Sequence, residues 1–447
     1  MKLAEHFLAQ HENPARRAAQ SPAPPWLAAL RADALEQFRA HGLPTLRDED
    51  WKYTDLRPLE KHRFAAANGE GEGEGEGDAA ALVKEAALHG VTPHRLVFVN
   101  NRLRADLCKL PDAAGLSVGS LRTAQLEHPE ALRPHLDQLA ARHRHGFTLL
   151  NSAAMDDGVF ITVADGAIID APLEILFLSA AAAPVMVQPR NLIVAGRGSA
   201  VTVIERYLSA SAGDAATLTN AVTEITAADN AAVHHLRLQQ ESGAAHHVGG
   251  VFADAAADAE VNTTAVILGG AWVRNDVTVR LNAPGARVTM NGLCIGAGRR
   301  HMDNHTRVEH AAPHCNSSEL YKSVLGGRAR SVFHGRILVQ PGAVKTDAYQ
   351  SNRNLLLSPE ARADSKPQLE IYADDVRCSH GATTGQLDGD ALFYLRARGI
   401  GGDRARAMLV MAFAAEVLRG VTGDTMRRYL EGEARANLDR ALGGQLQ

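Results

Sequence analysis

The segment YADDVRCSHGATTGQLD, at residues 372–388, places a cysteine and a histidine two residues apart. On a β-strand, residues i and i+2 project from the same face, so Cys378 and His380 would stand side by side. A thiolate and an imidazole can ligate iron, zinc or copper, or can act as a nucleophile and a base. A closed metal site normally needs four ligands, so any others would have to come from elsewhere, such as a second chain. A core cysteine beside a hydrogen-bonded histidine remains the structural alternative.

A second candidate is the densest histidine cluster of the chain, which consists of His301, His305, His310, His314 and Cys315. In a continuous strand His301 and His305 would share one face, while His310 and His314 would lie on the other. Pro313 would also interrupt strand pairing. A structural or surface role is therefore favoured for this cluster over a single metal site.

Nucleotide binding by this chain is not expected. The segment PGAVKTD contains Lys345 and Thr346 but lacks the glycines of a P-loop, so backbone amides could not wrap a phosphate in the usual way. The sequence also contains no H-E-x-x-H pair and no C-x-x-C pair, which argues against a zinc protease or a zinc knuckle.

The composition predicts a soluble globular protein. The 447 residues are 45% hydrophobic and 22% charged, with a net charge of −4. This balance gives no sign of the basic face that nucleic-acid binding requires, and no apolar run reaches the length of a membrane span. The first residues are too polar for a secretory signal, and four widely spaced cysteines form no disulfide framework. We therefore expect a cytoplasmic protein with neither nucleic-acid nor membrane partners.

The first zone, residues 1–145, is expected to be helical. Trp26, Leu30, Ala34 and Phe38 follow one helical stripe between prolines at its start and Gly42 at its end. RLVFVNNRL predicts a hairpin with an Asn-Asn turn. Alternating glycine and glutamate at 68–78 cannot form a core, so this tract is expected to be a flexible linker.

The second zone, residues 146–388, has period-two alternation and closely spaced turn signals, which predict an all-β architecture. A loose motif of small residues followed by valine recurs at GRGSAVTV, ADNAAVHH, ADAEVNTT and APGARVTM, at a nearly constant spacing. A turn-bounded unit that is stacked many times in this way is typical of a solenoid. A parallel β-helix is therefore preferred, with a large sandwich or jelly roll as the alternative.

The third zone, residues 389–447, is expected to be helical again. DRARAMLVMAFAAEVLRG is apolar around most of its circumference, which indicates a buried helix or one that presents a face to a partner. The candidate partner-binding residues of this helix are Met408, Leu409, Met411, Ala412 and Phe413.

Several long motifs resemble those of the SufB/SufD family of iron–sulfur cluster assembly proteins. They are GLPTLRDEDWKYTDL, DNHTRVEHAAPHC, YKSVLGGRARSVFHGRI, KTDAYQSNRNLLLS, ADSKPQLEIYADDVRCSHGATTGQLD and LFYLRARGI. The resemblance covers nearly the whole chain, apart from the Gly/Glu tract. It is closer to SufD than to SufB, because Gly381 stands where SufB-like chains have glutamate and NLLLSPEARADSKPQ lacks their sulfur-accepting cysteine.

The resemblance implies a right-handed parallel β-helix core between helical terminal domains, and a complex of SufB, SufD and two copies of SufC, an ABC-type ATPase. It implies a scaffold subunit and not an enzyme, with a nascent iron–sulfur cluster, or iron, held transiently at the interface with the SufB-like chain. The family histidine that matters at this interface matches His380, and Cys378 matches a neighbouring cysteine of less certain role. The C-terminal helices would dock the ATPase, and the isolated chain could pair with itself.

Two other functions stay open from the residues alone. One is an autonomous Cys/His metal-binding β-solenoid protein. The other is a β-helix enzyme acting on polysaccharide, although an aromatic content of 5% supplies few sugar-stacking side chains.

Overall fold

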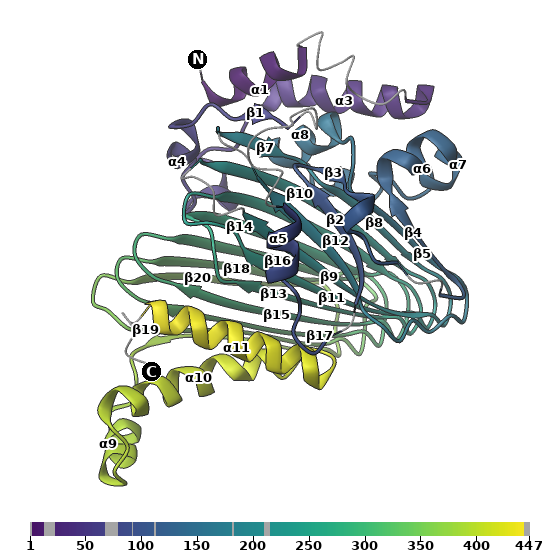
Figure 1. The fold of residues 1–447 in the computed structure, drawn as a ribbon. Helices are drawn as coiled ribbons and strands as arrows, with labels where there is room; N and C mark the ends of the chain where they lie inside the picture. Colours follow the sequence, from purple (N-terminus) through teal and green to yellow (C-terminus); the bar gives the residue numbers. More distant parts are fainter. Residues whose placement is uncertain are drawn as a thin grey trace.

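The computed structural model describes residues 2–12, 23–67, 79–91, 93–110, 113–180, 183–209 and 215–441. The Gly/Glu tract predicted to be a flexible linker, at 68–78, lies outside the described residues. A parallel β-solenoid forms the centre of the molecule, with helices from both ends of the chain on its outside (Figure 1). The predicted mainly β architecture is confirmed.

Two sheets form the walls of the solenoid. Sheet A contains, in spatial order, β20 (Arg362–Ile371), β18 (Arg330–Val339), β16 (His301–His310), β14 (Trp272–Leu281), β12 (His246–Ala255), β10 (Thr217–Ala227), β8 (Arg190–Ala195), β5 (Val159–Val163) and β4 (Leu116–Ser120), with β7 (Val185–Val187) and β1 (Ala65–Ala66) off this path. Sheet B contains β21 (Arg377–Gly385), β19 (Asp347–Leu356), β17 (Asn316–Leu325), β15 (Arg287–Gly296), β13 (Glu260–Ile267), β11 (Ala232–Gln240), β9 (Ala200–Ser209), β6 (Leu173–Ser179), β2 (His94–Val99) and β3 (Arg102–Leu103).

The strand register confirms the repeat predicted from the recurring motif. His235 pairs with Thr263, and Met290 pairs with Glu319, so each residue lies beside its counterpart in the next repeat. From β5 onward, all neighbouring strands in each sheet are parallel. Stacked coils require this arrangement, and a sandwich of hairpins would not allow it. The sandwich alternative is therefore wrong.

The recurring motif marks a turn with left-handed backbone geometry at the start of each coil. In its four occurrences the residues with positive φ are Gly198, Asn230, Asp258 and Gly285. Glycine, asparagine and aspartate are the residues that reach this region at least cost. The valines that follow in the motif, such as Val201 and Val233, then point into a continuous apolar interior.

Most of the N-terminal segment covers the outer face of sheet A, whereas residues 79–85 pack against β2 and β6 of sheet B. Its helices are α1 (Leu3–Glu12), α3 (Pro25–His41), α4 (Arg57–Glu60), α5 (Ala79–Glu85), α6 (Leu121–Glu127), α7 (Pro129–Leu132) and α8 (Gly146–Ala154), with 3₁₀ turns η1 (Glu49–Trp51), η3 (Ala105–Leu107) and η4 (Ala140–His143). Phe38 of α3, Trp51 of η1 and Phe147 of α8 pack in one cluster with Trp272 of β14. The predicted helix between the prolines and Gly42 is confirmed as α3.

The Asn-Asn hairpin is also confirmed. β2 and β3 pair antiparallel, and Asn100 and Asn101 both have positive φ, as a tight type I′ turn requires. β2 continues sheet B and β4 continues sheet A, so both sheets of the solenoid extend into the segment before residue 146.

The C-terminal helices are α9 (Gly389–Ala397), α10 (Gly402–Leu418) and α11 (Asp424–Ala441), and α10 and α11 lie beside sheet B (Figure 1). Val410 and Val417 of α10, with Leu430 of α11, cover Leu236 and Leu293 on the outer face of the sheet. α9 has no buried residue and projects away from the solenoid. None of the described helices is both long and apolar enough to cross a lipid bilayer.

Candidate functional site

Cys378 and His380 lie on β21, the last strand of sheet B. β21 pairs with β19, where Ala348 lies opposite Cys378 and Gln350 lies opposite His380. Period-two geometry places both side chains on the same side of the strand, as predicted. Cys378 packs against an apolar cluster that includes Ile337 and Ala348, whereas His380 is exposed because no further coil of the described chain covers it. The end of the solenoid thus presents an imidazole beside a half-buried thiol.

The electrostatics of this pair favour a neutral thiol in the free chain. Partial burial raises the pKa of Cys378, and the nearby carboxylate of Asp347 raises it further. A protonated thiol is a poor nucleophile and becomes a ligand only when it is deprotonated, which a bound metal ion favours. Within the described residues no third His, Cys, Asp or Glu completes a metal cluster with this pair. The pair supplies two ligands at most.

A polar column lies beneath His380 inside the solenoid. Gln350 is directly below His380, and Glu319 of β17 is directly below Gln350. Glu319 is fully buried, and it accepts hydrogen bonds from Thr306 Oγ1, at 2.6 Å, and from Gln350 Nε2, at 3.2 Å. Burial outweighs these two donors and raises the pKa of Glu319 to about 7.

We expect Glu319→Gln to stabilise the protein at alkaline pH and to have little effect in acid. The folded-state pKa of Glu319 is about 7, above the ordinary value of 4.5. Below pH 4.5 the carboxyl is neutral in both states, so the folded protein keeps its full stability. As pH rises through 7, the buried carboxyl must ionise in the folded state, and this stability is lost. The amide removes the ionisation and should raise the free energy of unfolding at pH 8 by on the order of 3 kcal/mol. Urea unfolding at pH 5 and pH 8 measures the difference; an equal effect at both values would contradict it.

The histidine cluster at residues 301–315 does not lie on one face of the sheet, as the alternation of side chains along a strand predicted. His301 and His305 of β16 lie on the outer face of sheet A, beneath the N-terminal segment. His310 is buried in the interior, with its Nε2 2.9 Å from Ser317 Oγ, and Cys315 is buried in the same core. His314 adopts a positive φ in the turn between the strands. These residues do not form one site.

Sequence reasoning missed a group of three side chains in the outer cleft of sheet A. Ligand atoms of Asp50, His305 and His334 all lie within 4.8 Å of one another, and the described part of the chain contains no second group of three such residues. His305 and His334 are opposite each other on β16 and β18, one repeat apart in the sequence. The repeat could therefore have revealed the histidine pair, but nothing in the sequence pattern points to Asp50.

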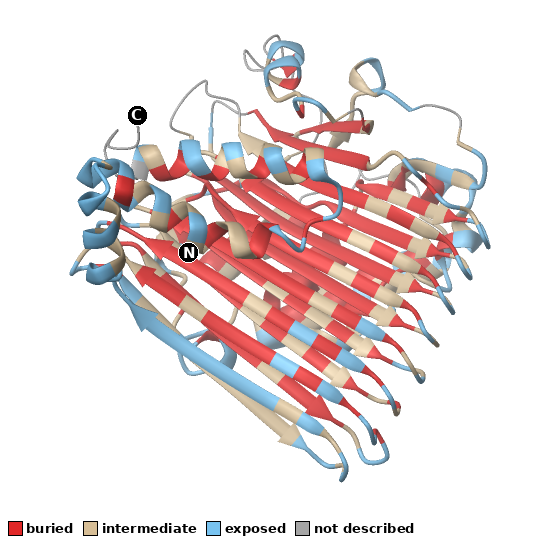
Figure 2. Ribbon diagram, turned by 90° about the horizontal axis from the view of Figure 1, so that it is seen from below, coloured by how far each residue is buried: buried red, intermediate tan, exposed pale blue. Residues whose placement is uncertain are grey.

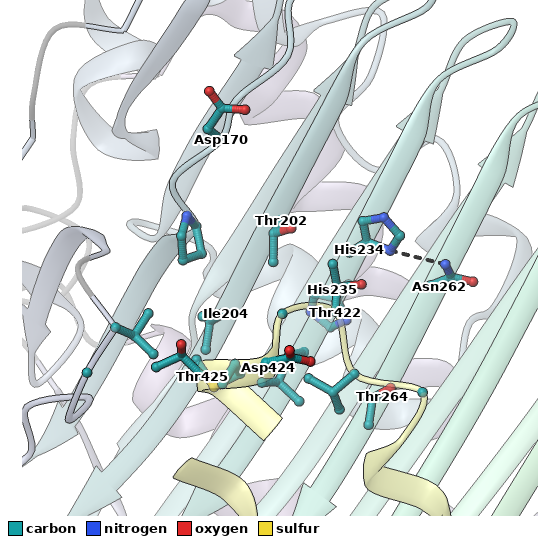
Figure 3. A pocket seen from close by; sticks show the side chains of 18 residues that line it. Asp170, Thr202, Ile204, His234, His235, Asn262, Thr264, Thr422, Asp424 and Thr425 are labelled. Atoms are coloured by element: carbon teal, nitrogen blue, oxygen red, sulfur yellow. Dashed lines mark hydrogen bonds between the residues drawn. The ribbon is translucent and has the colours of Figure 1, made fainter. Parts of the chain in front are cut away.

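A pocket of about 300 Å³ opens where the α10–α11 connection meets the outer face of sheet B (Figure 3). Thr202, His234 and Asn262 come from three neighbouring strands, and Asp424 and Thr425 come from the start of α11. Asn262 Nδ2 donates to His234 Nδ1 at 3.1 Å. This donor set has no pair of facing carboxylates or ligand cluster, so we assign no reaction to the pocket.

Comparisons with known proteins agree with the architecture. Residues 177–413 match the family model described as "SUF system FeS cluster assembly, SufBD core domain", and residues 1–175 match "SufBD protein N-terminal region". The chain belongs to the SufB/SufD family. It is 33% identical over 399 residues to the iron–sulfur cluster assembly protein SufD of Escherichia coli, covering 89% of each chain. It is 34% identical to a SufBD family protein of Synechocystis, covering 87% of this chain and 85% of that one, and 25% identical to SufD of Bacillus subtilis, covering 91% and 93%.

This SufBD chain is accordingly a SufD-like member of an iron–sulfur cluster assembly family. The core match spans most strands of the solenoid and includes β21, where Cys378 and His380 lie. The segment 354–368, which spans the end of β19, the following turn and most of β20, contains no cysteine. In the described SufBD core, Cys378 is therefore the half-buried thiol at the open end of the solenoid, whereas Cys294 and Cys315 are buried.

The five candidate partner-binding residues of α10 do not share one face. Met411 and Phe413 pack toward sheet B, and the Phe413 ring centroid also lies 4.2 Å from Lys322 Nζ. Met408 is 45% exposed and Ala412 is exposed, while Leu409 is half-buried. Beyond α10, Phe393 of α9 is 72% exposed. The exposed apolar side chains of this SufBD C-terminus therefore include Phe393 of α9 and both Met408 and Ala412 of α10.

Proposed function

We propose that this chain is a SufD-like scaffold subunit of a SufBCD-type complex, and that an iron–sulfur cluster is assembled at its interface with a SufB-like partner. The observation that carries the proposal is the open end of the solenoid, where β20 is mostly half-buried, β21 is exposed (Figure 2), and β21 carries an incomplete ligand pair. The cluster is the cargo of the complex and not a resident cofactor. The four free thiols agree with a reducing compartment, and we place the chain in the cytoplasm.

The backbone of the open end supports a docked protein. β20 pairs with β18 and β21 pairs with β19, and neither has a second neighbour among the described strands. Such edges expose unpaired N–H and C=O groups, which another strand can satisfy by continuing the sheet. Ile371 and Tyr372, both exposed, add apolar surface at the end of β20. A second solenoid that stacks on this end would cover the edges and Tyr372 together.

The same contact would complete the ligand set. Cys378 and His380 lie on the uncovered end strand and supply one sulfur and one imidazole nitrogen. Iron–sulfur chemistry draws on thiolate and imidazole ligands, and the two that this chain lacks would come from the facing strand of the partner. The role of the chain is then to position ligands, and ATP hydrolysis belongs to the ABC-type partner.

Affinity purification of the tagged chain from its own host, followed by mass spectrometry, tests complex membership. The proposal expects a SufB-like chain and an ABC-type ATPase in near-stoichiometric amounts. If the chain is recovered without either partner, alone or as a homodimer, the proposal fails and an autonomous metal-binding solenoid becomes the better account.

We expect Met408→Asp to weaken ATPase binding at least about 10-fold, or about 1.4 kcal/mol, because the new carboxylate would be buried in the interface without a partner. Met408 lies on the exposed side of α10, so the substitution should leave the fold intact. The matched control is Ala436→Asp, on the exposed side of α11. Isothermal titration with the purified ATPase measures both variants, and equal affinity for the two would place the docking surface elsewhere.

A further inference from the structure

The outer face of sheet A carries a row of polar side chains in one register position. Asp276 of β14, His305 of β16 and His334 of β18 are successive Cα partners, about 4.8 Å apart across the sheet. They line a cleft of about 690 Å³ between the sheet and the N-terminal segment. The 3₁₀ turn η1 stands over this row and contributes Asp50.

The position of Asp50 is fixed by its neighbours. Trp51 is buried and stacks on the guanidinium of Arg274, 4.0 Å from ring centroid to Cζ. Arg274 Nη1 donates to the backbone carbonyl of Asp50 at 2.6 Å, and Thr54 Oγ1 donates to Asp303 on β16. The backbone of η1 is thus held on the sheet, while the carboxylate of Asp50, 71% exposed, remains free to meet a ligand.

Polar groups beside the two imidazoles orient their rings. His334 Nε2 lies 2.8 Å from Gln368 Oε1, which can only accept, so Nε2 carries the proton. The lone pair of His334 is therefore on Nδ1, which lies 3.6 Å from Asp50 Oδ1. His305 Nε2 lies 3.1 Å from both Asp303 Oδ1 and Arg274 Nη1, and these two polar contacts hold the ring in place.

The charges around the cleft tolerate an added cation. The nearest one, Arg274, lies 3.1 Å from His305 Nε2, but it is paired with Asp276 at 2.8 Å and with Asp303 at 2.9 Å. Lys366, the next residue in the row after His334, is paired with Glu49. Arg336, which also lines the cleft, pairs with Glu370 at 2.7 Å, so each of these three cations has a carboxylate partner other than Asp50.

We propose that Asp50, His305 and His334 bind a divalent first-row transition-metal ion, of the class of Zn²⁺ or Fe²⁺, through two imidazoles and one carboxylate. Ligands about 2.1 Å from such an ion stand about 3.4 Å apart in a tetrahedral arrangement, close to the 3.6 Å between Asp50 and His334. The remaining positions open to the cleft and are left to water. This site lies on the outer face of sheet A, so it is separate from Cys378 and His380 on sheet B and does not depend on the proposed function.

Titration of the untagged full-length chain with Co²⁺ tests the site, because Co²⁺ reports its ligands by visible absorption. One Co²⁺ per chain should bind, with calorimetry giving the stoichiometry. Asp50→Asn and His334→Gln should each weaken binding by at least about 10-fold. Asp50→Asn keeps the backbone carbonyl that Arg274 contacts, so the variant is expected to fold, which circular dichroism checks.

Two controls separate this site from other sources of binding. Asp55→Asn removes a nearby carboxylate that pairs with Arg57, and His380→Ala removes the imidazole at the solenoid end; both should bind Co²⁺ as the wild type does. The inference is overturned if the wild type shows no saturable binding below about 1 mM, if Asp50→Asn and His334→Gln bind normally, or if His380→Ala abolishes binding.

Discussion

His380→Ala is expected to fold and to assemble with its partners, but to lower the iron–sulfur content of the co-expressed complex at least about 10-fold. The imidazole is exposed on β21, so its removal leaves no buried cavity and should change the melting temperature little. Under the proposed function, its contribution would lie in the ligand set at the solenoid end, where one of two available donors would be lost. Iron and acid-labile sulfide per complex, measured after co-expression, give the effect.

The neighbouring residues supply the controls for His380. Ser379→Ala changes the opposite face of the same strand and should leave cluster content unchanged. Cys378→Ser should have an intermediate effect, because the thiol is half-buried and packs against Ala348 as well as facing the end. Normal cluster content in His380→Ala would move the site elsewhere, and loss of folding would make His380 a structural residue.

Arg190→Met should reduce the free energy of unfolding by about 3–5 kcal/mol, the cost of leaving a buried charge without its partner. Arg190 is fully buried where β8 meets the N-terminal segment. Its Nη2 donates to Asp137 at 2.8 Å and to Glu224 at 2.6 Å, and its Nη1 donates to Asn151 at 3.1 Å. Methionine fills much of the volume but leaves both carboxylates without this cation in the core.

An exposed arginine provides the matched comparison. Arg197 forms an ion pair with Asp165 at 3.2 Å, and both side chains are exposed. Solvent screens such a pair, so Arg197→Met should cost no more than about 1 kcal/mol. Urea unfolding of the two variants measures the contrast, and equal free energies of unfolding would show that the Arg190 network contributes no more than a surface pair.

The solenoid could be predicted because each coil is specified by short sequence patterns that recur along the chain. Each coil needs a residue that tolerates left-handed geometry, and Gly198 and Asn230 mark that position in consecutive coils. The same repeat places Gln350 below His380, so the stacked columns follow from the sequence once the period is known. Period-two geometry also placed Cys378 and His380 on one side of a strand without any tertiary information.

Contacts between distant segments could not be predicted in this way. The stripe of α3 was expected to contain Trp26 and Leu30, but the structure buries Arg31, whose Nη2 donates to Gln125 at 2.9 Å in α6. Asp50 meets His334 only because Trp51 is held by Arg274, a contact with no periodic signal. Because α10 is hydrophobic on most sides, the sequence could not show which of its residues face sheet B. In the structure Phe413 packs toward sheet B, whereas Met408 is exposed.

Hydrogen–deuterium exchange of β21 in the free chain and in the assembled complex tests the central claim most directly. In the free chain, the outward amides of Arg377–Gly385 have no partner strand among the described residues and should exchange fast. Docking of a SufB-like solenoid on this end should slow their exchange at least about 10-fold, while peptides of exposed α11 residues such as Ala436 stay unchanged. If the complex forms and β21 exchanges as in the free chain, the interface does not lie at the open end, and the account is contradicted.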